Sequence, residues 1–513
     1  MVELKFYQDY NEDEKEIFIM NKEICQLINY ALKKQLIYEE DVDYCINQLL
    51  DLFHLDEFTK IETEDAPLEE ILEAMLEYAV AHDLCKDDIT SKDLFDTRIM
   101  DKVMPRPHEV IQDFNNRYAH SPHDATDYFY NLSISSNYIR MNRVNKNIKF
   151  KRDTKYGPLA ITINLSKPEK DPKEIAKARL LKSSGYPQCL LCKENVGFAG
   201  DLRRPARENH RIIPLNLSND RYYLQYSPYV YYNEHCIVFN EEHIPMKIDH
   251  QTFTHLLDFI EQFPHYMLGS NADLPIVGGS ILTHDHYQGG AYHFPIEDAK
   301  VITNYQIEGC HVELLHWPLS TIRLTSPSKD RLVQLADHIL EDWIDYDDTS
   351  RHIISHTEDT RHNTITPIAR RAGNDYQMDL VLRNNRTTAD YPLGIFHPHQ
   401  ENHHIKKENI GLIEVMGLAI LPARLKEEMS LLKDCLLKKK TIDDYECLLK
   451  HKEWFNELSK KDITEDNVDE IIKQGLADVF TSVLEDAGVY KMDEDGIKGF
   501  KKFVNYTLKG EIL

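Results

Sequence analysis

Two features that would place a chain in or across a membrane are missing from these 513 residues. No apolar run is long enough to cross a bilayer. Near the first residue no basic segment is followed by an apolar core, so no secretory signal is visible. We therefore expect a cytoplasmic protein with no membrane partner.

Cysteine is sparse and scattered, with nine residues between Cys25 and Cys447. An odd number of cysteines at long spacings does not resemble a disulfide framework. Free thiols persist in a reducing compartment, which agrees with the expected cytoplasmic location.

Positive charge is also in short supply, with 60 basic against 86 acidic residues and a net charge of −26. The long-range field of such a chain repels polyanions, which argues against a nucleic-acid or anionic-membrane partner. A small anionic substrate needs only a locally positive pocket. Arg203, Arg204, Arg207 and Arg211 form a basic, proline-broken stretch whose guanidinium groups could bind a diphosphate or ribose, although a solvated loop is the alternative.

What the chain does have is a hydrophobic content of 42%, enough for the cores of a globular protein of two to four domains. Apolar residues at helical spacing predict helices over residues 1–152 and again over 422–513. Alternating or aromatic runs between them predict strands at 159–165 and 291–294 and paired strands over 222–232 with a turn at 227–228. An apolar stripe that includes Phe253 and Leu256 predicts a further helix over 249–268. The expected fold class is α+β.

The densest group of chemically useful residues lies between Asp273 and Gly290. It opens with an apolar run that we expect to be a buried strand. Two glycine pairs then frame a serine, two histidines and a glutamine: Gly278, Gly279, Ser280, His284, His286, Gln288, Gly289 and Gly290. Alternate side chains of an extended segment share a face. Imidazole can serve as a nucleophile, base or metal ligand, and an amide can donate to a phosphoryl oxygen. A plain hydrogen-bonded histidine pair is the alternative, but four strand-weakening glycines favour a ligand site.

A second, looser copy of this order follows. A strand at 321–325, a helix at 329–344 and a hairpin turning at 372–375 lead to His397-Pro398-His399-Gln400. The same order in both halves suggests an internal duplication. Here the glutamine directly follows the second histidine, and the glycine pairs are missing. We expect this copy to be non-catalytic.

The Asp273–Gly290 segment closely resembles the active-site segment of the second class of galactose-1-phosphate (hexose-1-phosphate) uridylyltransferases, which belong to the histidine-triad superfamily. The resemblance covers most of the chain. It implies two histidine-triad-like halves of antiparallel sheet and helices, at 153–300 (catalytic) and 301–421, between helical regions at 1–152 and 422–513. It also implies a homodimer active in galactose metabolism. UDP-glucose and galactose 1-phosphate would yield glucose 1-phosphate and UDP-galactose.

The resemblance assigns roles to particular residues. His286 would attack phosphorus and carry the uridylyl group, Gln288 and Ser280 would donate to phosphoryl oxygens, and His284 would position the loop. Cys189-Leu190-Leu191-Cys192 alone is half a zinc site or a redox pair. The resemblance completes it as a structural zinc site with His243 and His284, whereas buried thiols and hydrogen-bonded histidines are the alternative. No organic cofactor is expected.

Substrate contacts are expected from the glycine pairs, from Arg203, Arg204 and Arg207, and from Glu414 in a weakly matching segment. The second half would contribute to hexose-phosphate binding or a second metal through His397, His399, His403 and His404. Two other functions stay open. One is a dinucleoside polyphosphate phosphorylase or hydrolase that uses the same nucleophile, and the other is a non-catalytic nucleotide-binding protein.

Overall fold

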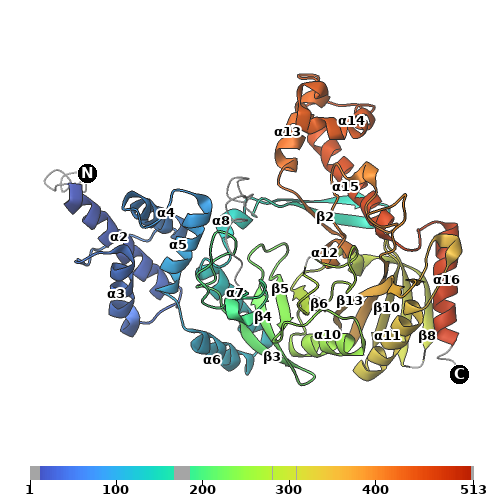
Figure 1. The fold of residues 1–513 in the computed structure, drawn as a ribbon, viewed down its shortest axis with the longest axis horizontal. Helices are drawn as coiled ribbons and strands as arrows, with labels where there is room; N and C mark the ends of the chain where they lie inside the picture. Colours follow the sequence, from blue (N-terminus) through green and yellow to red (C-terminus); the bar gives the residue numbers. More distant parts are fainter. Residues whose placement is uncertain (1–11, 167–184, 280, 308, 510–513) are drawn as a thin grey trace. The chain divides into compact units, whose positions relative to one another are not determined.

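The computed structural model describes residues 12–166, 185–279, 281–307 and 309–509 (Figure 1). The chain forms two compact units, each built from several segments. The first unit consists of Met1–Asn145, Pro168–Pro214 and Tyr223–Tyr229. The second consists of Lys146–Lys167, Leu215–Tyr222 and Val230–Leu513.

Helices make up most of the first unit, in keeping with the helical spacing of its apolar residues. They are α2 (Glu12–Lys33), α3 (Val42–Phe53), α4 (Leu68–Ala81), α5 (Ile89–Asp101), α6 (Pro107–Tyr118), α7 (Pro122–Ser135) and α8 (Met141–Val144). Leu27, Leu49 and Met75, each from a different helix, are fully buried. The basic stretch and the cysteine pair of the sequence also belong to this unit.

The second unit contains a large antiparallel sheet. In the order β5-β7-β6-β13-β14-β10-β9-β8, every neighbouring pair is antiparallel. These strands are β5 (Cys236–Asn240), β6 (Met267–Gly269), β7 (His286–Gly290), β8 (Lys300–Ile307), β9 (Cys310–His316), β10 (Thr321–Ser326), β13 (Asn363–Ala372) and β14 (Asp375–Asn384). Strands β3 (Ile213–Leu217) and β4 (Asp220–Tyr226) are joined by a tight turn whose two residues both have positive φ.

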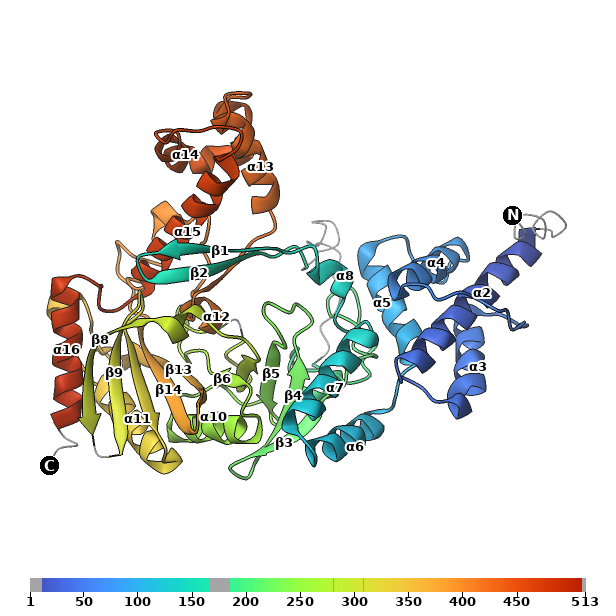
Figure 2. The same ribbon diagram turned by 180° about the vertical axis from the view of Figure 1, so that it is seen from behind.

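Two helices pack on this sheet and on each other: α10 (His250–Gln262) and α11 (Lys329–Ile344) (Figures 1 and 2). Helix α10 is capped at its N-terminus by Asp249, whose carboxylate accepts hydrogen bonds from the amides of Gln251 and Thr252. Its predicted apolar stripe, which includes Phe253 and Leu256, is fully buried. The pair of helices therefore closes one face of the sheet that carries the histidine segment.

A smaller sheet and further helices complete the second unit. In this sheet β1 (Ile148–Thr154) pairs antiparallel with β2 (Gly157–Ile163), which pairs parallel with β15 (Leu418–Leu421). The two-stranded sheet is β11 (His356–Thr357) and β12 (Thr360–Arg361), and the remaining helices are α12 (Leu412–Val415), α13 (Leu425–Leu436), α14 (Lys452–Leu458), α15 (Val468–Ala487) and α16 (Glu494–Lys509). Helix α15 lies against β1 (Figure 2).

The fold class, α+β with antiparallel sheet, is confirmed, whereas four local expectations were wrong. The apolar run after Asp273 forms turns, not a strand, and strand structure begins only at His286. Residues 291–294 are not a strand. The helix expected over 249–268 ends at Gln262 because Pro264 cannot continue it, and β6 follows. Of the aromatic run 222–232, only the part up to Tyr226 is strand. Within the described ranges no helix is suited to crossing a bilayer.

Candidate active site

Strand β7 lies between β5 and β6, which place Cys236 and Leu268 opposite Gly289. A Cβ atom at Gly289 would lie 2.4 Å from the carbonyl oxygen of Met267. Gly290 has a φ of +148°, which side chains rarely tolerate. Both glycines are therefore required by the close approach of neighbouring backbone, so they do not by themselves indicate a ligand site.

His286 is the first residue of β7 and is 6% exposed. Its Nδ1 lies 2.8 Å from the carbonyl oxygen of His284. A carbonyl can only accept, so the hydrogen is on Nδ1 and Nε2 carries the lone pair. Burial lowers the pKa of His286 to about 4. The structure thus presents a neutral imidazole with its nucleophilic nitrogen defined.

Gln288 follows two residues later on the same strand. Its Oε1 lies 3.2 Å from Nε2 of His235, a residue that stands just before β5. The sequence offered no indication of this contact, because nothing in the local pattern distinguishes His235 from other histidines.

The side chain of Asp285, the residue between the two histidines, belongs to a largely buried hydrogen-bond network. Its carboxylate accepts a hydrogen bond of 2.6 Å from the Tyr222 hydroxyl. His255 joins the network through Nδ1, which lies 3.2 Å from that hydroxyl and 3.0 Å from the hydroxyl of Tyr287. The other ring nitrogen of His255 lies 3.0 Å from a carboxylate oxygen of Asp220. Burial raises the pKa of Asp285 to about 6. The network fixes the backbone that supports both motif histidines, and its members were missed because they are distant in sequence.

The turn segment that precedes the two histidines is held by Arg361 and Thr364, which lie about ninety residues further along the chain. Asp273 accepts hydrogen bonds from Arg361 at 2.7 Å and from Thr364 at 2.5 Å. A Cβ atom at Gly278 would lie 2.4 Å from the carbonyl oxygen of Ala272. These long-range contacts explain why an apolar run that resembles a strand folds into turns.

Gly279 faces the side chain of Asn271, whose Nδ2 would lie 2.8 Å from an added Cβ. The Oδ1 of Asn271 accepts a hydrogen bond of 2.9 Å from the backbone amide of Leu412. Ser280, the other expected phosphate donor, lies outside the described residues.

The four expected zinc ligands occur as two pairs, one in each unit. In the first unit Sγ of Cys189 lies 3.6 Å from Sγ of Cys192, and burial raises the pKa of Cys189 to about 11. In the second unit the rings of His243 and His284 have centroids 4.8 Å apart. Nε2 of His284 lies 2.9 Å from the carbonyl oxygen of Asn240 and therefore donates to it.

The basic stretch makes most of its contacts within the first unit. Arg204 forms an ion pair with Asp201 at 2.6 Å, and the same carboxylate accepts from the backbone amide of Arg203. The guanidinium of Arg207 lies over the ring of Tyr138, with its carbon 5.2 Å from the ring centroid. These contacts shape the loop and leave its role towards a ligand a prediction.

Glu414, expected to contact the sugar, forms an ion pair with Lys406 at 3.0 Å. The side chains of Glu414 and Lys406 are 12% and 7% exposed. Arg383 lies nearby, almost fully buried, and donates to the carbonyl oxygen of Ile410 at 2.8 Å. Burial lowers the pKa of Arg383 to about 10, and the charge of Glu414 opposes that shift.

The four histidines of the second copy, at 397, 399, 403 and 404, do not share one partner. Nε2 of His397 lies 3.2 Å from Oδ1 of Asn409. Nε2 of His403 donates to the carbonyl oxygen of Pro398. His404 instead pairs with His451, with the two Nδ1 atoms 2.7 Å apart.

His399 has acidic neighbours. His399, Glu401 and Asp486 each offer a ligand atom within 4.8 Å of the others. Nε2 of His399 is 3.0 Å from the carbonyl oxygen of Ile395, so this ring too is oriented by nearby backbone.

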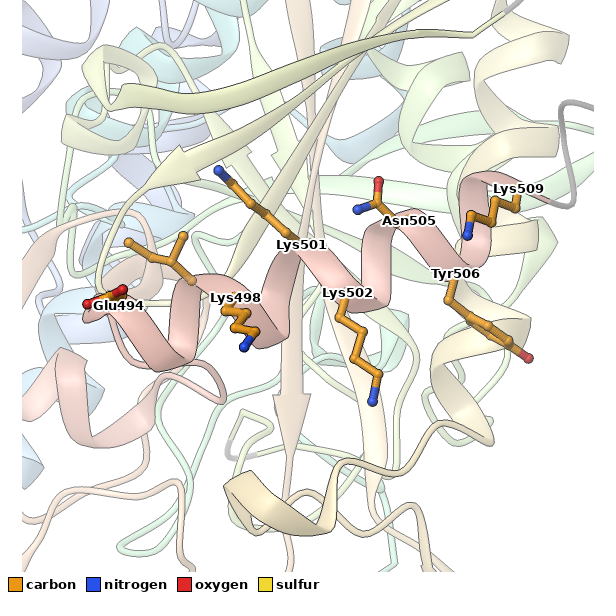
Figure 3. Close-up of a pocket in the computed structure, with 8 residues that line it drawn as sticks. Glu494, Lys498, Lys501, Lys502, Asn505, Tyr506 and Lys509 are labelled. Carbon is orange, nitrogen blue, oxygen red and sulfur yellow. The ribbon is translucent and has the colours of Figure 1, made fainter.

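A separate surface hollow lies along helix α16, and none of the site residues considered so far lines it. It is lined by Glu494, Ile497, Lys498, Lys501, Lys502, Asn505, Tyr506 and Lys509. Figure 3 shows these side chains extending from the one helix. The lysines make a local positive surface on an acidic chain, but no histidine lines this hollow.

Two family models cover most of the chain. The model described as "Galactose-1-phosphate uridyl transferase, N-terminal domain" matches residues 35–245. The corresponding C-terminal domain model matches residues 259–455. The histidine segment lies within the second match.

Full-length relatives agree with the family models. The galactose-1-phosphate uridylyltransferase of Clostridium acetobutylicum is 55% identical over 495 residues, covering 95% of this chain and 100% of the relative. That of Caldanaerobacter subterraneus is 52% identical, covering 93% and 96%. That of Bacillus subtilis is 47% identical, covering 94% and 96%. Among solved structures, a yeast Ap4A phosphorylase aligns with a TM-score of 0.30 and 12% identity over 63% of this chain and 90% of its own.

Proposed function

Because this chain belongs to the galactose-1-phosphate uridylyltransferase family, we propose that it transfers a uridylyl group from UDP-glucose to galactose 1-phosphate. The products are glucose 1-phosphate and UDP-galactose, an exchange that belongs to galactose metabolism. The observation that carries the mechanism is the buried, neutral ring of His286, whose Nδ1–H is directed to the His284 carbonyl.

The first half-reaction makes a covalent intermediate. Nε2 of His286 attacks the α-phosphorus of UDP-glucose, the bond from that phosphorus to the bridging oxygen breaks, and glucose 1-phosphate leaves with the electron pair. A neutral nucleophile avoids bringing two anions together. The positive charge that develops on the ring is stabilised by the hydrogen bond from Nδ1 to the His284 carbonyl oxygen.

The second half-reaction reverses the roles of the phosphates. A phosphate oxygen of galactose 1-phosphate attacks the same phosphorus, and the nitrogen–phosphorus bond breaks to restore the imidazole. Both leaving groups are weakly basic, so no strong general acid is needed. Gln288 and Ser280 would donate to the phosphoryl oxygens in both steps. The glycine pairs, the arginines at 203, 204 and 207, and Glu414 would contact the remainder of the substrates.

Zinc is the metal that the donor chemistry supports. Cys189, Cys192, His243 and His284 offer two sulfur and two nitrogen ligands, the composition of closed structural zinc sites. His284 donates Nε2–H to a backbone carbonyl, as metal-bound histidines commonly do, which leaves Nδ1 as its ligand atom. Bound zinc would supply folding stability and orient His284, and no step of the transfer passes through it.

The proposal extends to the setting of the enzyme. A cytoplasmic location is supported by the scattered positions of the nine cysteines, which do not resemble a disulfide framework. We also propose that the enzyme is a homodimer and that its regions divide near residues 152, 300 and 421. The second copy would have a supporting role in hexose-phosphate or metal binding.

A transfer assay tests this function directly. Purified protein is given UDP-glucose with galactose 1-phosphate, inorganic phosphate or water as acceptor, and the products are quantified. We expect glucose 1-phosphate and UDP-galactose in equal amounts with the sugar phosphate, and little turnover with the other acceptors. Turnover with inorganic phosphate alone would indicate a phosphorylase, and binding without any turnover would indicate a nucleotide-binding protein.

A further inference from the structure

His235 is a buried histidine to which the mechanism above assigns no role. It is 2% exposed, and its Nε2 lies 3.2 Å from Oε1 of Gln288 across the β5–β7 pair. The ring packs against those of Tyr231 and Tyr232, with centroid distances of 5.4 and 4.6 Å. A histidine in such a position can determine whether the oxygen or the NH₂ group of a neighbouring amide faces it.

The tautomer of His235 follows from what its two nitrogens meet. Burial lowers the pKa of the ring to about 4, so it is neutral and carries one hydrogen. Among the described residues, Nδ1 is buried without a hydrogen-bond partner. A hydrogen on Nδ1 would be an orphaned buried donor, which proteins tolerate less than an unpaired acceptor. The hydrogen therefore belongs on Nε2, where it donates to Oε1 of Gln288.

This donation selects one orientation of the Gln288 amide. The two ends of an amide are alike in shape, and rotation by half a turn exchanges them, so the hydrogen-bond partner decides between them. With Oε1 bound to His235, the NH₂ end remains to donate elsewhere. Without His235, the carbonyl end could turn to the substrate and repel a phosphoryl oxygen.

We propose that His235 is a positioning residue, which holds the Gln288 amide with its NH₂ group available to the phosphoryl group in transfer. The proposal rests on the proposed function and deepens it. It adds a residue that acts through Gln288 and does not itself touch the reacting atoms.

The test is a double-mutant cycle on the uridylylation rate measured in single turnover with UDP-glucose. His235→Phe keeps a ring between the tyrosines but removes the donor, and we expect a loss of about tenfold, the scale of one misplaced hydrogen bond. His235→Gln restores a donor near Nε2 and should recover part of that loss. In a Gln288→Ala background, His235→Phe should change the rate by less than about twofold, because its effect passes through the missing amide.

Several outcomes decide the matter. An equal loss from His235→Phe in both backgrounds would overturn the proposal, since it would show a general structural role. Wild-type rates in His235→Phe would also overturn it. If His235→Phe does not fold, His235→Leu, which also lacks a donor, is carried through the same cycle, and coupling to Gln288 again decides. A wild-type enzyme that forms no uridylyl adduct would refute the proposed function before His235 is tested, so the two failures are distinguishable.

Discussion

The two His-x-His regions of the second unit contain similar residues in different backbone settings. His286 and Gln288 lie on β7, a strand with a paired neighbour on each side. His397 and His399 lie in irregular chain, and the following glutamine starts the short 3-10 helix Gln400–Asn402. A ladder of backbone hydrogen bonds holds a nucleophile and its neighbouring amide in fixed positions, which an irregular segment does not provide.

The second region also lies against the first. Asn385 donates to the carbonyl oxygen of Pro275 at 3.2 Å, and Arg361 forms its ion pair with Asp273. A Cβ atom at Gly394 would lie 2.9 Å from a methyl group of Ile276. The half of the chain that contains the second His-x-His region, which we propose to be non-catalytic, thus supports the turn that precedes β7.

The sharpest test of this difference is to remove the matching histidine from each region. His286→Asn should lower uridylyl transfer by on the order of 10⁴-fold or more, because the nucleophile is lost. His397→Asn, the control, should change the rate by less than about tenfold, because its ring contacts Asn409 and the second copy is proposed to take no part in the transfer itself. Steady-state assays with melting curves for each variant measure both. Comparable losses would mean that the regions are not functionally distinct.

The glutamines provide a second comparison. Gln288→Glu replaces a donor with an anion near the phosphoryl group and should cost a factor of roughly 10² to 10³. Both half-reactions should slow, because both pass through the same phosphorus. Gln400→Glu should be nearly neutral. Pre-steady-state rates of uridylylation and deuridylylation separate the steps. Slowing of one half-reaction alone would assign Gln288 to a sugar phosphate.

The zinc proposal concerns the first region only, through His284. Purified protein should carry about one zinc per chain if the four ligands form a closed site. Cys189→Ser should lose that zinc and lower the melting temperature more than it lowers kcat. Cys447→Ser, at an exposed thiol, is the matched control. Metal analysis and calorimetry report the result. Fully active, metal-free protein with an unchanged melting temperature would refute the site.

The smallest effect is expected from the pH response of the second region. Burial lowers the pKa of His404 to about 4, below the value of about 6.5 for an unfolded histidine. The unfolded chain then binds the proton more readily, so the stability that the neutral ring contributes above pH 6.5 is lost as the pH falls towards 4. His404→Gln should therefore show a smaller drop in melting temperature between pH 7 and pH 5. An unchanged drop would mean that other groups dominate the response.

Local patterns in the sequence predicted the elements that local interactions determine. Helix 329–344 and the hairpin turn at 372–375 occur with the predicted bounds, because apolar spacing and turn residues suffice there. The fold class followed from the same signals. The apolar run after Asp273 was wrongly predicted to be a strand, because contacts such as Arg361–Asp273 join residues far apart in sequence.

The residues of the candidate site can likewise be separated into those that the sequence predicted and those that only the structure showed. The motif histidines and Gln288 were visible because they alternate within one short segment. His235, Tyr222 and His255 were not, since only the folded sheet brings them to the back of that segment. Two of the glycines interpreted as room for a ligand, Gly289 and Gly290, prove to be required by neighbouring backbone.

The proposed function depends most on His286 as the carrier of the uridylyl group. Intact-protein mass spectrometry after incubation with UDP-glucose alone, followed by peptide mapping under non-acidic conditions, tests this directly. We predict one uridylyl adduct per chain, located on His286, lost in acid and discharged by galactose 1-phosphate. An enzyme that turns over while no adduct forms under trapping conditions, or an adduct on another residue, would contradict the account.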